Sequence, residues 1–114
     1  MKMGKITNSK IWEASEVSEV IALYMTFLSA QLYGQKIVKS HHYKPLAEKL
    51  SRSVGSVESK LMNVSGALLA HGRQDLIVRG YKPLSNYSID LLDAVDVAII
   101  QVFESVKYNK LAVA

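Results

Sequence analysis

Apolar residues recur at steps of three and four along the first third of the chain, and this periodicity constrains the fold more than any other feature. Such spacing places apolar side chains on one face of an α-helix. The residues on this face are Val17, Val20, Ile21, Tyr24, Phe27, Leu28 and Leu32. Ser15 is suited to cap the start of the helix, and Gly34 to end it. The pattern therefore predicts a helix over 15–33.

Three further helices are predicted after a polar and basic loop over 35–43. Pro45 fits the first turn of a short helix, because its missing N–H is not needed there. Ser53 can cap a longer helix that ends near Gly72. The predicted ranges of these helices are 45–51, 54–70 and 88–107. A turn-rich connection precedes the last of them, and Leu76, Ile77 and Val78 could form a short extended piece in it.

The fold class that follows is all-α, a single helical domain of four helices over 1–114. The chain is 49% apolar, which is too much for a disordered segment, and its length suits one core. The absence of cysteine excludes a disulfide framework, a cysteine–zinc site and a thiol nucleophile.

No membrane segment or signal peptide is expected. The longest uncharged stretch, Val20 to Gln35, has 16 residues and contains polar side chains, whereas a membrane span needs about 20 mostly apolar residues. We therefore expect a cytoplasmic protein.

The net charge of +4 is concentrated in the middle of the chain. Residues 31–82 hold nine basic and three acidic side chains, while the segment after them is acidic. This asymmetry indicates a polyanionic partner, although a basic surface that is only solvated would give the same composition.

The segment 45–61 has the pattern of a helix-turn-helix: a short helix, a three-residue break and a longer helix. Serines near the start of the second helix could approach phosphates or base edges, and Arg52 and Lys60 flank them. The candidate DNA-contacting residues are Lys44, Arg52, Ser53, Ser56, Ser59, Lys60, Asn63 and Lys82.

A helical hairpin with a serine cap also occurs in all-α domains that bind no nucleic acid. Glu58 would repel phosphate unless it pairs with Arg52 or contacts a cytosine amine. Both interpretations of the hairpin stay open on the sequence alone.

Trp12 at the entry of the first helix, followed by the hairpin, resembles the three-helix Myb/SANT class. Two motifs narrow this resemblance. They are Arg52-Ser53-x-x-Ser56-Val57-Glu58-x-Lys60-x-x-Asn63-Val64-Ser65-Gly66-x-Leu68 and Gly80-Tyr81-Lys82-Pro83-Leu84-x-Asn86-Tyr87. Together they resemble the N-terminal module of bacterial HNH and related restriction-type endonucleases, over roughly residues 12–100.

In those proteins the module precedes the nuclease and looks like a target-recognition domain. The resemblance therefore implies a stand-alone helix-turn-helix module without the cleavage activity. Such a module could serve a phage or a mobile element as a regulator or a decoy, by analogy.

Catalytic and metal-binding motifs are not found in the sequence. No P-loop, dinucleotide turn, nucleophile elbow or HNH core is present. His41 and His42 would point apart on a helix, and Asp90, Asp93 and Asp96 are typical of a solvated helix face. We expect no enzyme, no metal and no cofactor.

The final helix has a wider apolar surface than one small core requires, which predicts self-association. The candidate dimer-interface residues are Leu92, Val95, Ile99, Val102 and Phe103. A homodimer would present two helix-turn-helix units to one duplex. The alternative is that this helix is simply central in the bundle.

The sequence thus predicts a non-catalytic protein that binds double-stranded DNA. The alternative from another class is a small inhibitor of the anti-CRISPR or anti-restriction type. Such a protein would dock on a host defence nuclease complex through protein–protein contacts.

Overall fold

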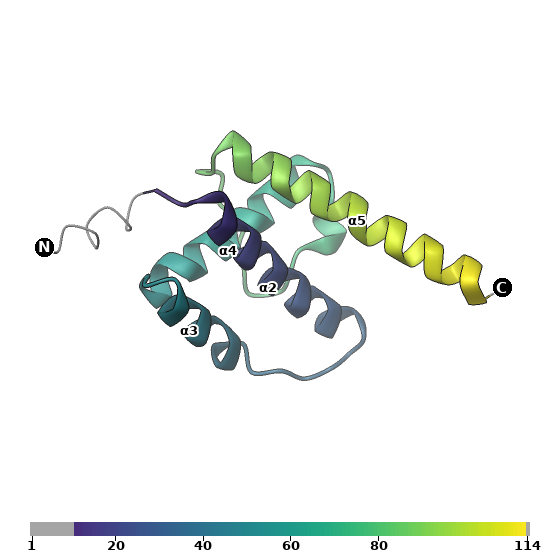
Figure 1. Ribbon diagram of the computed structural model, residues 1–114, viewed down its shortest axis with the longest axis horizontal. Coiled ribbons are helices and arrows are strands. Elements are labelled where there is room, and N and C mark those ends of the chain that lie inside the picture. The colour runs from purple at the N-terminus through teal and green to yellow at the C-terminus, as the bar shows by residue number, and fades with distance from the viewer. Residues whose placement is uncertain (1–10, 114) are drawn as a thin grey trace, which may run out of the picture.

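The computed structural model describes the backbone of residues 11–113 and the side chains of residues 11–101. Its elements are α2 (Ala14–Leu32), α3 (Ser40–Lys49), α4 (Val54–Ala70), the 3-10 turn η1 (Gln74–Leu76) and α5 (Ile89–Val113). No strand occurs over 11–113, and the all-α four-helix fold is confirmed. α2, α3 and α5 lie around α4 (Figure 1).

α2 begins one residue earlier than predicted because another residue caps it. Glu13 is the N-cap, and its carboxylate accepts from the backbone N–H of Glu16. The carboxylate of Glu16 in turn accepts from the N–H of Glu13 at 3.0 Å. This reciprocal capping box satisfies two helix-end donors and makes a cap by Ser15 unnecessary.

α3 is longer than the predicted 45–51 and includes much of the segment expected to be a loop. It starts at Ser40, so Pro45 lies inside the helix and not in its first turn. Contacts with the core favour this earlier start. The ring of His42 packs edge-on against Phe27 at 5.8 Å between centroids, and Tyr43 is half-buried against the core.

α4 occupies the predicted range and is the central helix. Its first N–H groups are capped by Ser53, whose hydroxyl accepts from the N–H of Ser56 at 3.0 Å. Most of its second half is buried, and only Leu69 and Ala70 at its end are exposed. The buried residues there are Leu61, Asn63, Val64, Ser65, Gly66, Ala67 and Leu68.

The connection from α4 to α5 crosses back over the middle of α4. The N–H of Leu84 donates to the carbonyl of Met62 at 3.1 Å. This approach requires a residue without a side chain at Gly66, because a Cβ there would lie 2.0 Å from the Leu84 carbonyl oxygen. The segment is otherwise irregular: Leu76 ends η1, the backbone of Ile77 is extended, and no strand forms over 76–78.

The core is aromatic on the side of this connection. Tyr81 is only 5% exposed, and its ring stacks with Phe27 at 6.0 Å and approaches Tyr24 at 6.3 Å. The hydroxyl of Tyr24 accepts from the N–H of Val78 at 2.8 Å, which joins the connection to α2.

α5 is six residues longer than predicted at its C-terminal end, and its last turns run beyond the other helices (Figure 1). Its first half belongs to the core. Val95 is fully buried and Ile99 is 7% exposed, so neither is available as the dimer contact that the sequence suggested. Leu92 is half-buried, while Val102 and Phe103 lie beyond the side chains that the structure describes.

Candidate nucleic-acid interface

The hairpin of α3 and α4 is closed by a tight turn over residues 50–53. Ser51 adopts a left-handed conformation with φ of 55°, and the N–H of Arg52 donates to the Ala47 carbonyl at 2.9 Å. The turn directs the start of α4 outward. Ser53 and Ser59 are exposed there, and Ser56 and Lys60 are half-buried.

Arg52 faces inward, away from this exposed group. Its side chain is 1% exposed, and its guanidinium pairs with the Glu16 carboxylate at 2.9 and 3.1 Å. It also donates to the Ile11 carbonyl at 2.5 Å and lies 4.0 Å from the centre of the Trp12 ring. Because Arg52 joins the start of α2 to the turn, we leave it out of the candidate interface.

Asn63 is also occupied inside the protein. Its residue is 4% exposed, and its amide donates to the Leu84 carbonyl at 3.3 Å and to the Asn86 side-chain oxygen at 3.0 Å. These bonds hold the crossing segment on α4. Asn63 therefore serves the fold, and the second motif of the resemblance is packed on the first.

Lys60 is the cation closest to the exposed serines along α4. Among the described residues it has no ion pair, and its ammonium lies 5.0 Å from the centre of the Trp12 ring. Burial, and next the charge of Arg52, lower the pKa of Lys60 below its usual value. An anion placed here would stabilise the charged form of Lys60. The position of Trp12 beside Lys60 could not be foreseen from sequence spacing.

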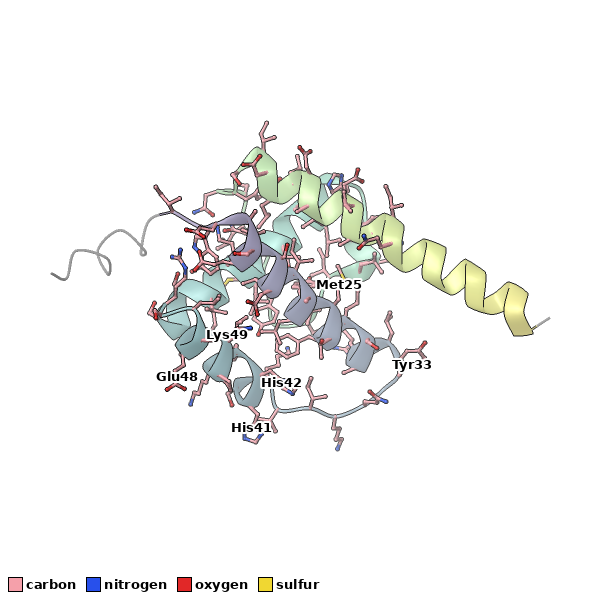
Figure 2. All side chains as sticks on the ribbon, in the orientation of Figure 1. Met25, Tyr33, His41, His42, Glu48 and Lys49 are labelled. Carbon is pink, nitrogen blue, oxygen red and sulfur yellow. The ribbon has the colours of Figure 1, made fainter. Side chains whose placement is uncertain are left out.

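The other two predicted cations lie away from the start of α4. Lys44 is exposed on α3. Lys82 is exposed directly after Tyr81, whose ring lies under the ammonium of Lys39 at 4.9 Å. Lys39 precedes α3, a helix of ten residues and thus about 15 Å long, at the end opposite the turn. His41 and Glu48 point outward from α3 (Figure 2).

Next to the turn, the accessible part of α4 is therefore its first two turns, while the exposed Leu69 and Ala70 lie at its opposite end. The candidate interface, as defined by exposure, consists of Ser53, Ser56, Ser59 and Lys60, with Gly55 open to solvent among them. Small side chains allow a close approach of a partner's backbone, and the free N–H groups of a helix start favour anions.

Among the residues that the structure describes, no group of three His, Cys, Asp or Glu side chains is arranged to hold a metal ion. The described helices include none with the length and apolar character of a membrane span. Asp96 has a histidine neighbour, because Nδ1 of His71 lies 4.0 Å from its carboxylate.

Comparison of the chain with protein-family models, with curated proteins and with solved structures found no match.

Proposed function

We propose that this protein binds double-stranded DNA without catalysis, through the start of α4. The observation that carries the proposal is Lys60, a half-buried lysine that forms no ion pair among the described residues and follows three serines at the start of the same helix. Phosphate is the anion that such a combination suits, because hydroxyls, backbone N–H groups and a lysine all contact phosphates in DNA complexes.

The burial of Leu61 and of residues 63–68 in α4 sets the form of this contact. Only the first two turns could enter a major groove, so base contacts would come from Ser56 and Ser59. A binding mode with few base contacts depends mainly on phosphate contacts, and its affinity falls steeply with salt.

The test is a fluorescence-anisotropy titration of a labelled duplex at about 50 and about 200 mM salt. Lys60→Gln is expected to reduce the slope of log K against log salt by about 0.9, the value for one phosphate contact. Ser59→Glu is expected to weaken binding, because it adds a negative charge to the exposed start of α4.

The matched control is Gln101→Glu, which makes the same charge change at an exposed helical position on α5. Equal affinities of the Ser59→Glu and Gln101→Glu proteins would contradict the proposed interface. A wild-type protein without duplex affinity at the lower salt would contradict DNA binding altogether.

An inhibitor that docks on a nuclease complex is the second candidate. It is favoured by large apolar side chains at the end of α2 and in the following loop. Leu32, Tyr33 and Val38 are 62%, 77% and 54% exposed, and Tyr33 extends away from the fold (Figure 2). Exposed apolar groups of this kind suit a protein partner more than a DNA backbone. If the wild-type protein does not bind duplex DNA, the inhibitor function becomes the favoured one.

We also propose that self-association uses the outer face of α5. Val97 and Ile100 are 52% and 51% exposed there, and Ile89 is 71% exposed. They replace Val95 and Ile99 as candidate contacts of a two-fold dimer.

A further inference from the structure

A second basic site lies at the opposite end of α3 from the turn. It is a pocket of about 530 Å³ between the end of α2, the loop before α3 and the backbone at Val78 and Arg79. Three cations line it: Lys36, Lys39 and Arg79. The lining contains no acidic residue.

Lys39 is held in place before any ligand binds. Its ammonium donates to the Arg79 carbonyl at 2.6 Å and lies 4.9 Å from the centre of the Tyr81 ring. Gly80 leaves the room for it, since a Cβ there would lie 3.2 Å from the ammonium nitrogen and the φ of +95° already favours glycine. Two of its three donors are left for a ligand.

Besides the bond between Tyr24 and the N–H of Val78, Gln31 fixes the wall that carries Arg79 to α2. The amide nitrogen of Gln31 donates to the Ile77 carbonyl at 3.2 Å, and its oxygen accepts from the N–H of Arg79 at 2.8 Å. This clamp holds the Val78–Arg79 backbone against the end of α2. The pocket is thus built on a fixed frame.

The charge in this pocket is not neutralised by the rest of the described protein. The ion pairs within the described residues use Lys49, Arg52, His71 and Arg73, and none uses a pocket cation. Three positive charges around one hollow attract an anion more strongly than the same charges spread over a flat surface. Phe27, Ile37 and Val78 add an apolar wall beside them.

We propose that this pocket binds a phosphate-bearing ligand. Its oxygens accept from Lys36, Lys39 and Arg79, and the remainder of the ligand lies against Phe27, Ile37 and Val78. A phosphate group suits the site better than a carboxylate does, because it has more charge and more acceptor oxygens for three donors, and the arginine can contact two of them. The volume is in the range of small-molecule sites.

The phosphate can belong to a free nucleotide or to a nucleic-acid strand. In the second case the inference rests on the proposed DNA binding and adds a contact beyond the start of α4. The two sources share the chemistry at the pocket and differ in what else they touch.

The test is isothermal titration calorimetry of the full chain with pyrophosphate, then with AMP and ATP. The informative variant is Lys36→Gln with Arg79→Gln, because both residues are exposed and substitution leaves the bonded Lys39 intact. The matched control is Lys44→Gln with Lys82→Gln, which removes the same charge from exposed positions outside the pocket lining.

The pocket variant is expected to raise the Kd for pyrophosphate about tenfold or more, because it removes two of the three cations that contact the ligand. The control is expected to change it little. The proposal is overturned if the pocket variant and the control lose the same affinity for pyrophosphate. It is also overturned if the wild-type protein does not bind pyrophosphate.

Duplex DNA then separates the two sources and the two proposals. If the pocket takes a strand phosphate, the pocket variant weakens both duplex and pyrophosphate binding, whereas Lys60→Gln weakens duplex binding alone. If the ligand is a free nucleotide, AMP or ATP binds more tightly than pyrophosphate and the pocket variant leaves duplex affinity unchanged. A protein that binds pyrophosphate but not duplex DNA would refute the proposed function and support phosphate binding in the pocket.

Discussion

The hydroxyl of Tyr24 and the hydroxyl of Ser65 lie 2.8 Å apart in the buried contact between α2 and α4. Both residues are fully buried, and Tyr24 also accepts from the N–H of Val78. One oxygen atom therefore joins two helices and the connection that follows them. Burial raises the pKa of Tyr24 above its usual value, which favours the protonated hydroxyl that these hydrogen bonds use.

Tyr24→Phe is expected to lower the free energy of unfolding by about 1–3 kcal/mol, because it leaves Ser65 and the Val78 N–H without their partner. Tyr81→Phe is the matched comparison. The Tyr81 hydroxyl is buried and has no hydrogen-bond partner among the described residues, so its removal is expected to be neutral or stabilising. Urea unfolding of both variants measures this, and an equal loss of stability in the two would contradict the described hydrogen bonding.

Glu16 is expected to make stability depend on pH in the acid range. The hydrogen bond from Arg52 holds the pKa of this carboxyl below its usual value of 4.5. A lowered pKa in the folded state means that the contribution to stability is complete above the unfolded pKa and is lost as the pH falls through the folded pKa.

Glu16→Gln tests that dependence. At pH 7 the variant is expected to lose about 3 kcal/mol of stability, because it leaves the buried Arg52 charge without its carboxylate. The difference from the wild-type protein should narrow as the pH falls below the folded pKa, when the wild-type carboxyl is also neutral. A difference that stays constant between pH 7 and pH 3 in urea titrations would argue against the ion pair.

Gly66→Ala is expected to destabilise the protein by about 1–3 kcal/mol or more, because the added methyl group collides with the Leu84 backbone. Gly55→Ala is the control in the same helix. A Cβ at Gly55 meets no atom within 4 Å, so alanine should raise stability there by about 0.5–1 kcal/mol through helix propensity. Thermal unfolding followed by circular dichroism measures the change in stability of both variants. We expect a decrease for Gly66→Ala and an increase for Gly55→Ala.

Self-association is tested by light scattering at micromolar concentration. A dimer has twice the monomer mass of 12.6 kDa. Val97→Asp with Ile100→Asp is expected to halve the measured mass with helicity retained, because both side chains are exposed. A monomeric wild-type protein would rule out this use of α5.

The sequence predicted α4 well because its signals are local. Ser53 caps the helix, the apolar stripe runs without interruption, and Gly72 follows the end with a φ of +74°. Tyr81, in the second motif of the resemblance, is a buried packing residue. The predicted start of α3 was wrong because the polar residues before Pro45 indicated a loop. The contact between His42 and Phe27 that favours the earlier start is not visible in the local sequence pattern.

Side-chain partners far along the chain could not be predicted in this way. Arg52 has the residue type of a DNA contact, but Glu16 lies 36 positions earlier, and only the folded chain brings the two together. Similarly, Lys39 and Arg79 are 40 positions apart, and no sequence motif predicts the pocket that they line. The basic middle of the sequence indicated an anion, without indicating where it would bind.

The bonds that hold α2 to the later part of the chain span large sequence distances. Tyr24 reaches Ser65 across 41 positions and Val78 across 54, and Gln31 reaches Arg79 across 48. Closing such loops costs conformational entropy before the contacts compensate for it, which slows folding relative to a simple helical hairpin. A nascent chain that ends after α4 still lacks Val78. The N–H group that donates to the buried Tyr24 hydroxyl is therefore present only after the connection has been synthesised. Folding is therefore expected as one concerted step late in synthesis, with no stable unit formed by α2, α3 and α4 alone.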